Sequence, residues 1–187
     1  MLVPKIRKLV EAAAKSKNNL YGYSAWTHHI VLVEKYGARL AKQLYANEEI
    51  VRLACLLHDY SCLVNKKFYR RHHQHSARLA EQILKAEKYP QEKIKLIKDC
   101  ILSHRGSVKL KKKTLEAKIL ADADALAHFA ALDDLFFLAY KILKLNTDDG
   151  RQYVLRKLDR SWQKLSPTAK EIIRERYILI KKVFPLK

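Results

Sequence analysis

Residues 48–60 read EEIVRLACLLHDY, and the interpretation of the whole chain begins from this stretch. Its apolar residues recur at intervals of three and four, which predicts a helix with one buried face. Asn47, directly before it, is a residue type that caps helix N-termini. The stretch ends in His58-Asp59, a polar pair that follows an apolar run. Because neighbouring side chains on a helix diverge by about 100°, both can face one ion only where the helix ends.

The rest of the chain carries the same periodicity, and no useful length of sequence alternates with the period of two that strands require. Glycine and proline number only 4 each, which favours helices joined by short loops. We therefore expect an all-α fold, a compact bundle of about eight helices. Residues 1–187 are expected to form a single domain, with 150–187 as C-terminal helices packed on the core.

The expected helices cover 4–15, a segment from a Ser24 cap to about Tyr45, 48–60, 75–86, 91–104, 115–143 as one long helix or two joined end to end, and two basic helices that meet at Ser166-Pro167. Residues 61–74 are polar, basic and aperiodic, and we expect a loop over a site there. Asp148 to Gly150 is expected to mark a further break.

The composition indicates the kind of partner. Lys plus Arg number 38 and Asp plus Glu number 19, a net charge of +19 that attracts anions such as nucleotides, nucleic acid or acidic membrane surfaces. The 3 cysteines contain no C-x-x-C pair, so each is expected to be a small buried residue in a reducing cytoplasm. The sequence shows no signal peptide and no apolar run long enough to span a membrane, and we expect a cytoplasmic protein.

Several histidines and one aspartate lie on inward faces of the expected helices, where an unpaired polar group costs several kcal/mol. They are His29, His58, His75, His104 and Asp124. One such residue is most often a satisfied polar group of the core. Several on separate helices suggest a common centre, because metal sites in bundles are built from facing helices.

Three motifs carry a resemblance: HHIVLV at 28–33, LACLLHDY at 53–60 and ILADADALAHF at 119–129. With HHQHSARLAEQIL at 72–84 and CILSHR at 100–105, they resemble the HD-domain superfamily of metal-dependent phosphohydrolases over nearly the whole chain. The layout is also similar to that of diadenosine tetraphosphate hydrolases of this fold. The superfamily pattern is a lone His, a His-Asp pair and a distant Asp.

The resemblance implies a ligand set, and it leaves alternatives open. The implied ligands are His29, with His28 as the alternative, His58, Asp59 and Asp124, with Asp122 as the alternative, and, in a two-metal site, His75 and His104. Imidazole and carboxylate ligands without thiolate suit one or two divalent transition-metal ions, Mn, Fe, Co, Ni or Zn. Asp59 is expected to bridge two metals, and Asp124 or Asp122 to act as general base. His128, one turn after Asp124, either supports the site or packs in the core.

Many members of the superfamily follow His-Asp with x-Gly-Lys, whereas this chain has Tyr60-Ser61-Cys62. A nearby lysine is expected to replace the missing one, and other basic residues to meet phosphate. The candidates are Lys66, Lys67, Arg70, Arg71, His72, Arg105 and Lys109, with His72 or His73 also considered as general acid.

The expected function is a metal-dependent phosphohydrolase acting on a phosphomonoester or phosphoanhydride, a nucleotide or related metabolite, with no membrane partner. The missing Gly-Lys favours an alternative, a non-catalytic ligand-binding or regulatory HD module. The charge of +19 motivates a third reading, an RNA-binding helical protein, which is less favoured because the chain has no recognised RNA-binding motif. A homodimer through the C-terminal helices stays open.

Overall fold

The computed structural model describes residues 2–105 and 110–184, and within these ranges the chain is helical without a strand. The expected all-α fold is confirmed. In chain order the elements are α1 (Leu2–Ala14), the π-helical η1 (Ala25–Ile30), α2 (Val31–Gln43), α3 (Glu48–Leu57), α4 (Tyr60–Val64), the 3₁₀-helical η2 (Lys66–Arg71), α5 (His72–Ala86), α6 (Gln91–Ser103), α7 (Leu115–Ala130), α8 (Leu132–Phe137), the π-helical η3 (Leu138–Ile142), α9 (Thr147–Lys164) and α10 (Pro167–Val183).

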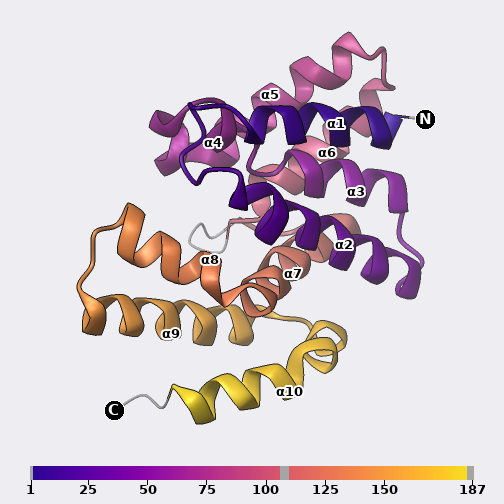
Figure 1. The fold of residues 1–187 in the computed structure, drawn as a ribbon. Coiled ribbons are helices and arrows are strands. Elements are labelled where there is room, and N and C mark those ends of the chain that lie inside the picture. The colour runs from indigo at the N-terminus through magenta and orange to yellow at the C-terminus, as the bar shows by residue number, and fades with distance from the viewer. Residues whose placement is uncertain (1, 106–109, 185–187) are drawn as a thin grey trace.

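Helix α7 crosses the middle of the molecule, with α1 to α6 on one side and α8 to α10 on the other (Figure 1). α2 packs along both α7 and α3, α5 packs along α6, and α9 and α10 pack on α7. Apolar residues such as Leu40, Leu53, Leu120 and Phe129 are fully buried between these helices. The metal-ligand candidates therefore start from elements that share one core.

Helices α2 and α3 approach closely at Gly37. A Cβ atom at Gly37 would stand 2.5 Å from Cys55 Sγ and 3.1 Å from Val51 Cγ1, closer than van der Waals contact allows. The missing side chain therefore sets the spacing between the two helices. Because His29 lies in η1, which leads directly into α2, and His58 follows α3, this spacing also sets how near those two histidines come.

A buried carboxylate links the first three helices. Glu34 on α2 is 3% exposed and accepts hydrogen bonds from Arg52 Nη2 at 2.8 Å and Arg52 Nε at 3.1 Å. Arg7 on α1 donates to its other oxygen. A buried charge is tolerated only where it is paired in this way. The two ion pairs that share Glu34 thus fix α1, α2 and α3 relative to one another.

The segment before α2 differs from the expectation of one helix capped by Ser24. Ser24 makes no capping hydrogen bond, and its hydroxyl donates instead to the Tyr21 carbonyl oxygen at 3.1 Å. Residues Ala25–Ile30 form a π-helical stretch, and α2 ends at Gln43. The extra residue per turn in a π-helix shifts the direction of the side chains that follow.

The structure resolves four further expectations. The expected loop over 61–74 is wrong, because α4, η2 and the first turn of α5 occupy it. The break expected at Asp148 to Gly150 is also wrong, because Asn146 caps α9 by accepting from the Asp149 amide at 2.9 Å. The 115–143 segment is divided, since α7 ends at Ala130 and α8 begins at Leu132. The boundary between two helices at Ser166-Pro167 is confirmed, and the structure shows Ser166 as the cap of α10 with Pro167 at its start.

All three cysteines are buried and free, as expected. None of the helices in the described part of the chain is both long and apolar enough to cross a membrane.

Candidate metal centre

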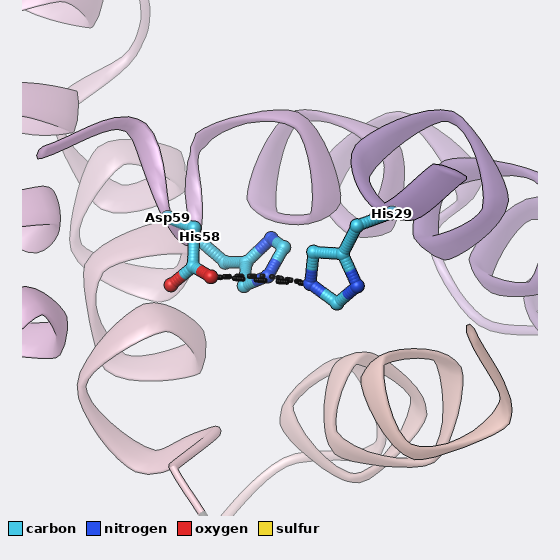
Figure 2. Close-up of side chains that lie close together, drawn as sticks. All are labelled: His29, His58 and Asp59. Atoms are coloured by element: carbon cyan, nitrogen blue, oxygen red, sulfur yellow. Dashed lines mark hydrogen bonds and ion pairs between the residues drawn. The ribbon is translucent and has the colours of Figure 1, made fainter. Parts of the chain in front are cut away.

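The His58-Asp59 pair lies at a change of helix direction. α3 ends at Leu57, and Asp59 leaves helical geometry at φ −112°, ψ 11° before α4 begins at Tyr60. The turn between the two helices allows both neighbouring side chains to face the same place. Figure 2 shows the His58 and Asp59 side chains pointing toward His29, which comes from η1.

The four residues of the expected primary set converge. His29 Nε2 lies 3.2 Å from His58 Nε2 and 3.4 Å from Asp124 Oδ1. Asp59 Oδ2 lies 3.5 Å from His58 Nε2 and 3.9 Å from His29 Nε2, and His58 Nε2 lies 3.9 Å from Asp124 Oδ1. The alternative His28 is half exposed and pairs with Asp133 at 3.4 Å. These donor separations suit one small cation among the four side chains.

The second oxygen of Asp59 faces another pair of histidines. Asp59 Oδ1 lies 3.4 Å from His72 Nε2 and 3.9 Å from His104 Nε2, and the two Nε2 atoms are 3.4 Å apart. The structure thus places His72, not His75, beside His104. His75 stacks on Phe68 with ring centroids 4.1 Å apart. The reason is that α5 begins at His72, so the inward position falls three residues earlier than expected.

Main-chain contacts fix the tautomers of three of these histidines. In His58, His72 and His104, Nδ1 bonds to the carbonyl oxygen three residues earlier, at 2.7, 2.9 and 2.6 Å. A carbonyl oxygen only accepts, so each Nδ1 carries the proton and each Nε2 presents a lone pair to the centre. The Nε2 lone pairs of His72 and His104 therefore face each other, an arrangement that a cation between them would stabilise.

Electrostatics favour neutral imidazoles and ionised carboxylates here. Burial lowers the pKa of His104 to about 4, and it also lowers the pKa of His29. Burial by itself would raise the pKa values of Asp59 and Asp124, but the surrounding imidazoles outweigh it and hold both pKa values below the usual range. These are the protonation states that metal ligands require.

A polar atom of Asp59 is left without a donor. Asp59 Oδ1 is buried and finds no hydrogen-bond partner among the described residues. Cys62 Sγ lies within 4.8 Å of a carboxylate oxygen of Asp59 and a ring nitrogen of His72, but burial and then Asp59 raise the pKa of the thiol. The donor set is thus imidazole and carboxylate, which fits a divalent transition metal.

Asp122 points elsewhere. It is buried, and its Oδ1 accepts a hydrogen bond from the Ser166 amide at 3.0 Å, at the start of α10. Residues that are two positions apart on a helix point in directions that differ by about 200°, so Asp122 and Asp124 cannot both face the centre. Asp122 therefore lies apart from the converging side chains and does not line the cavity beside them. Asp122 holds α10 against α7.

A cavity of about 400 Å³ opens beside the cluster. Its polar lining includes His29, Asp59, His72, His104, Arg105, Lys112, Asp124, His128, Asp134, Lys157, Arg160, Ser161 and Lys164, and its aromatic and apolar lining includes Tyr21, Leu63, Tyr69, Leu135, Leu138 and Tyr153. Of the basic residues expected to meet phosphate, Arg105 and His72 line it.

The other expected phosphate contacts lie away from the cavity. Lys66, Lys67, Arg70 and Arg71 are exposed on η2, because that segment is a helix on the surface and not a loop folded over the site. Arg105 donates a hydrogen bond to the Arg70 carbonyl oxygen, which ties η2 to the cavity wall. Lys109 lies outside the described residues, and His73 is a buried residue of α5.

Two further residues line the cavity beside these candidates. His128, expected either to support the site or to pack in the core, has its Nε2 3.8 Å from Asp124 Oδ1, and its ring stacks on His29 with centroids 5.4 Å apart. Lys157 comes from α9; burial lowers its pKa, and the nearby Asp124 and Asp59 offset part of that effect. A lysine in a basic helix has no sequence signal that separates it from surface charge.

The family model described as HD domain matches residues 26–128, more than half of the chain and all of the converging ligands. The chain belongs to the HD-domain family. HD domains are metal-dependent, and the His and Asp cluster of this HD domain is a group that could hold a metal ion.

Two solved structures share the HD fold of this chain. One is the Lin1889 protein from Listeria innocua, with a TM-score of 0.70 and 22% identity over 98% of this chain and 94% of that chain. The other is a predicted HD superfamily hydrolase from an uncultured Thermotogales bacterium, with a TM-score of 0.58 and 19% identity over 92% of this chain and 91% of that chain. No curated protein matches the chain.

Proposed function

We propose that this HD domain is a metal-dependent phosphohydrolase that acts on a phosphomonoester or phosphoanhydride, with a nucleotide or related metabolite as the favoured class. One observation carries the proposal: a single cavity joins the buried His and Asp cluster to fixed positive charges. Asp59 lines this cavity together with Arg105 and Lys157. A phosphoryl group develops negative charge on its oxygens during transfer, and positioned cations stabilise that charge.

His29, His58, Asp59 and Asp124 would hold one divalent cation, and Asp59 with His72 and His104 would hold a second. Bound there, the metal would supply Lewis acidity that activates water and neutralises charge on the phosphoryl group. The main-chain bonds to Nδ1 keep three imidazoles in the ligand tautomer, so these side chains need no rearrangement.

The protein's own groups account for binding and proton handling. Lys157 and Arg105 bind and orient the phosphoryl oxygens from opposite parts of the chain. Asp134 lines the same cavity, and its Oδ1 is buried without a hydrogen-bond partner among the described residues. Burial raises the pKa of Asp134, which helps it hold a proton for the leaving group.

The remaining lining suits the organic part of a substrate. Tyr21, Tyr69 and Tyr153 present aromatic rings, and Leu135 and Leu138 add apolar surface. Aromatic rings bind flat organic groups such as nucleobases, and the volume of about 400 Å³ lies in the range of small-molecule sites. The Thermotogales neighbour, described as a predicted HD superfamily hydrolase, supports hydrolysis as the reaction class.

The test combines metal analysis with a screen of phosphate esters and anhydrides. Full-length protein is loaded separately with Mn, Fe, Co, Ni and Zn, its metal content is measured, and phosphate release is followed. We expect turnover with at least one metal, and a loss of at least about a thousand-fold in Asp59→Ala. His75→Ala is the matched control, because His75 stacks on Phe68 outside the cluster and should keep near wild-type activity.

Two results would refute the proposal. Metal-loaded protein that hydrolyses no phosphate ester or anhydride would favour the non-catalytic regulatory alternative. Full activity in Asp59→Ala, with folding verified by circular dichroism, would show that the cluster is not the reaction centre.

A further inference from the structure

Helix α10 has apolar residues on two opposite faces. The inner face, which includes Ile173 and Ile180, is buried in the core. On the outer face Ile178 is 47% exposed, Leu179 60% and Val183 67%. Figure 1 shows α10 at the edge of the molecule, with α9 on its inner side. Large apolar side chains that gather on one exposed helix face are typical of an interaction surface.

Two charged residues flank this apolar face. Glu175 lies one turn before Ile178 and Leu179, and Lys182 lies one turn after them, so the four side chains share one side of the helix. Glu175 and Lys182 are both exposed, and neither has an ion pair or hydrogen bond from its side chain among the described residues. Because about 10 Å of helix separates them, they cannot pair with each other within one copy.

The outer face is complementary to itself in an antiparallel arrangement. When a two-fold axis passes between positions 178 and 179, Ile178 lies opposite Leu179 of the second copy. Glu175 then lies opposite Lys182 of the second copy, since the two residues are equally far from the axis along the helix. The symmetry repeats each of these contacts. A parallel pair would instead place each charge opposite its own equivalent, which is repulsive.

We propose that this face binds a second copy of the chain and forms a two-fold symmetric dimer through antiparallel α10 helices. Ile178 and Leu179 form the apolar centre of the contact, with Val183 beside it. Burial of these side chains drives association. The two Glu175–Lys182 ion pairs fix the orientation and the register of the helices. The inference is independent of the proposed function, because the outer face of α10 does not line the cavity.

The expected dimer is weak and reversible. One helix from each copy makes a small contact compared with the about 1,200–2,000 Å² that stable complexes bury. We therefore expect a dissociation constant on the order of 10 μM. This range is measurable by sedimentation equilibrium of the full-length protein over a series of concentrations.

The test exchanges the charges of the two flanking residues. Glu175→Lys and Lys182→Glu are each measured alone, and then as an equimolar mixture. Each substitution alone places like charges opposite each other at both ends of the contact. A copy of one variant that meets a copy of the other regains two pairs of opposite charge. The control is Glu92→Lys, which makes the same charge change at an exposed position of α6.

We expect each variant alone to dimerise at least about ten-fold more weakly than wild type, and Glu92→Lys to stay within about two-fold of it. The mixture should recover to within about three-fold of wild type.

Three results would overturn the inference. Wild-type protein that stays monomeric up to about 1 mM would show that this face does not bind a second copy. Equal dissociation constants in wild type and both variants would show that the copies meet through another surface. A mixture that associates no better than either variant alone would exclude the antiparallel register.

Discussion

Gly37→Ala tests the idea that a missing side chain sets the distance between α2 and α3. Alanine in place of glycine favours a helix by about 1 kcal/mol. Against this, the new methyl group would stand 2.5 Å from Cys55 Sγ, so the helices or the thiol must shift by more than 1 Å, within a core where Cys55 is 0% exposed. Overpacking of this kind costs about 1–3 kcal/mol. The difference between the two effects is a net loss of up to about 2 kcal/mol in the free energy of unfolding.

The assay is urea unfolding of four proteins: wild type, Gly37→Ala, Cys55→Ala and the double variant. Cys55→Ala removes the sulfur and leaves space for the new methyl group, so Gly37→Ala should cost at least about 1 kcal/mol less in that background. A loss of the same size in both backgrounds would refute the reasoning. Metal affinity offers a second readout, because a wider gap between α2 and α3 moves His29 away from His58.

The remaining predictions address charge and protons. Glu34→Gln should lower the free energy of unfolding by about 2 kcal/mol, because it leaves Arg7 and Arg52 beside a buried neutral group; unchanged stability in urea would contradict this. Metal-free protein should lose stability as pH falls from about 6.5 toward 4, since the unfolded chain then protonates an imidazole that stays neutral in the folded state, where burial holds the pKa of His104 at about 4. His104→Gln should reduce that loss by about 2 kcal/mol between pH 7 and pH 5, and an unaltered pH profile would argue against the burial effect. Asp134→Asn should lower kcat about a hundred-fold for alkyl phosphates and much less for aryl phosphates, whose leaving groups need no proton; equal losses would exclude the proton-donor role.

The sequence predicts the helical class and the converging set well, because both depend on local patterns. The spacing of apolar residues by three and four in 48–60 predicts α3. The His-Asp pair follows the end of this helix, and the change of backbone direction there is enough to let both side chains face one centre. The ends of helices are less predictable. Ser24 is a good cap type, yet the chain before α2 adopts a π-helical turn that the periodicity of the sequence does not predict.

The exchange of His72 for His75 has a single cause. Residues 61–74 contain four basic residues and two adjacent histidines, which predicts a solvated loop, whereas packing extends α5 back to His72. His72 and His75 lie one turn apart on about the same side of the helix, so the earlier start of α5 adds a histidine, and it is this one that lies beside His104. Lys157 was beyond sequence reasoning for another reason, since only the fold brings α9 to the cavity.

The π-helical turn that carries His29 has an evolutionary consequence. Removing Ile30, the residue between His29 and α2, would restore regular α-helical winding, the lower-energy choice for the backbone, but would rotate His29 by about 100° relative to α2. Selection for thermal stability alone would therefore favour a deletion that moves a candidate metal ligand out of the cluster. If sequences that descend from this chain keep the π-helical turn, selection has acted on the position of His29 and not on thermal stability.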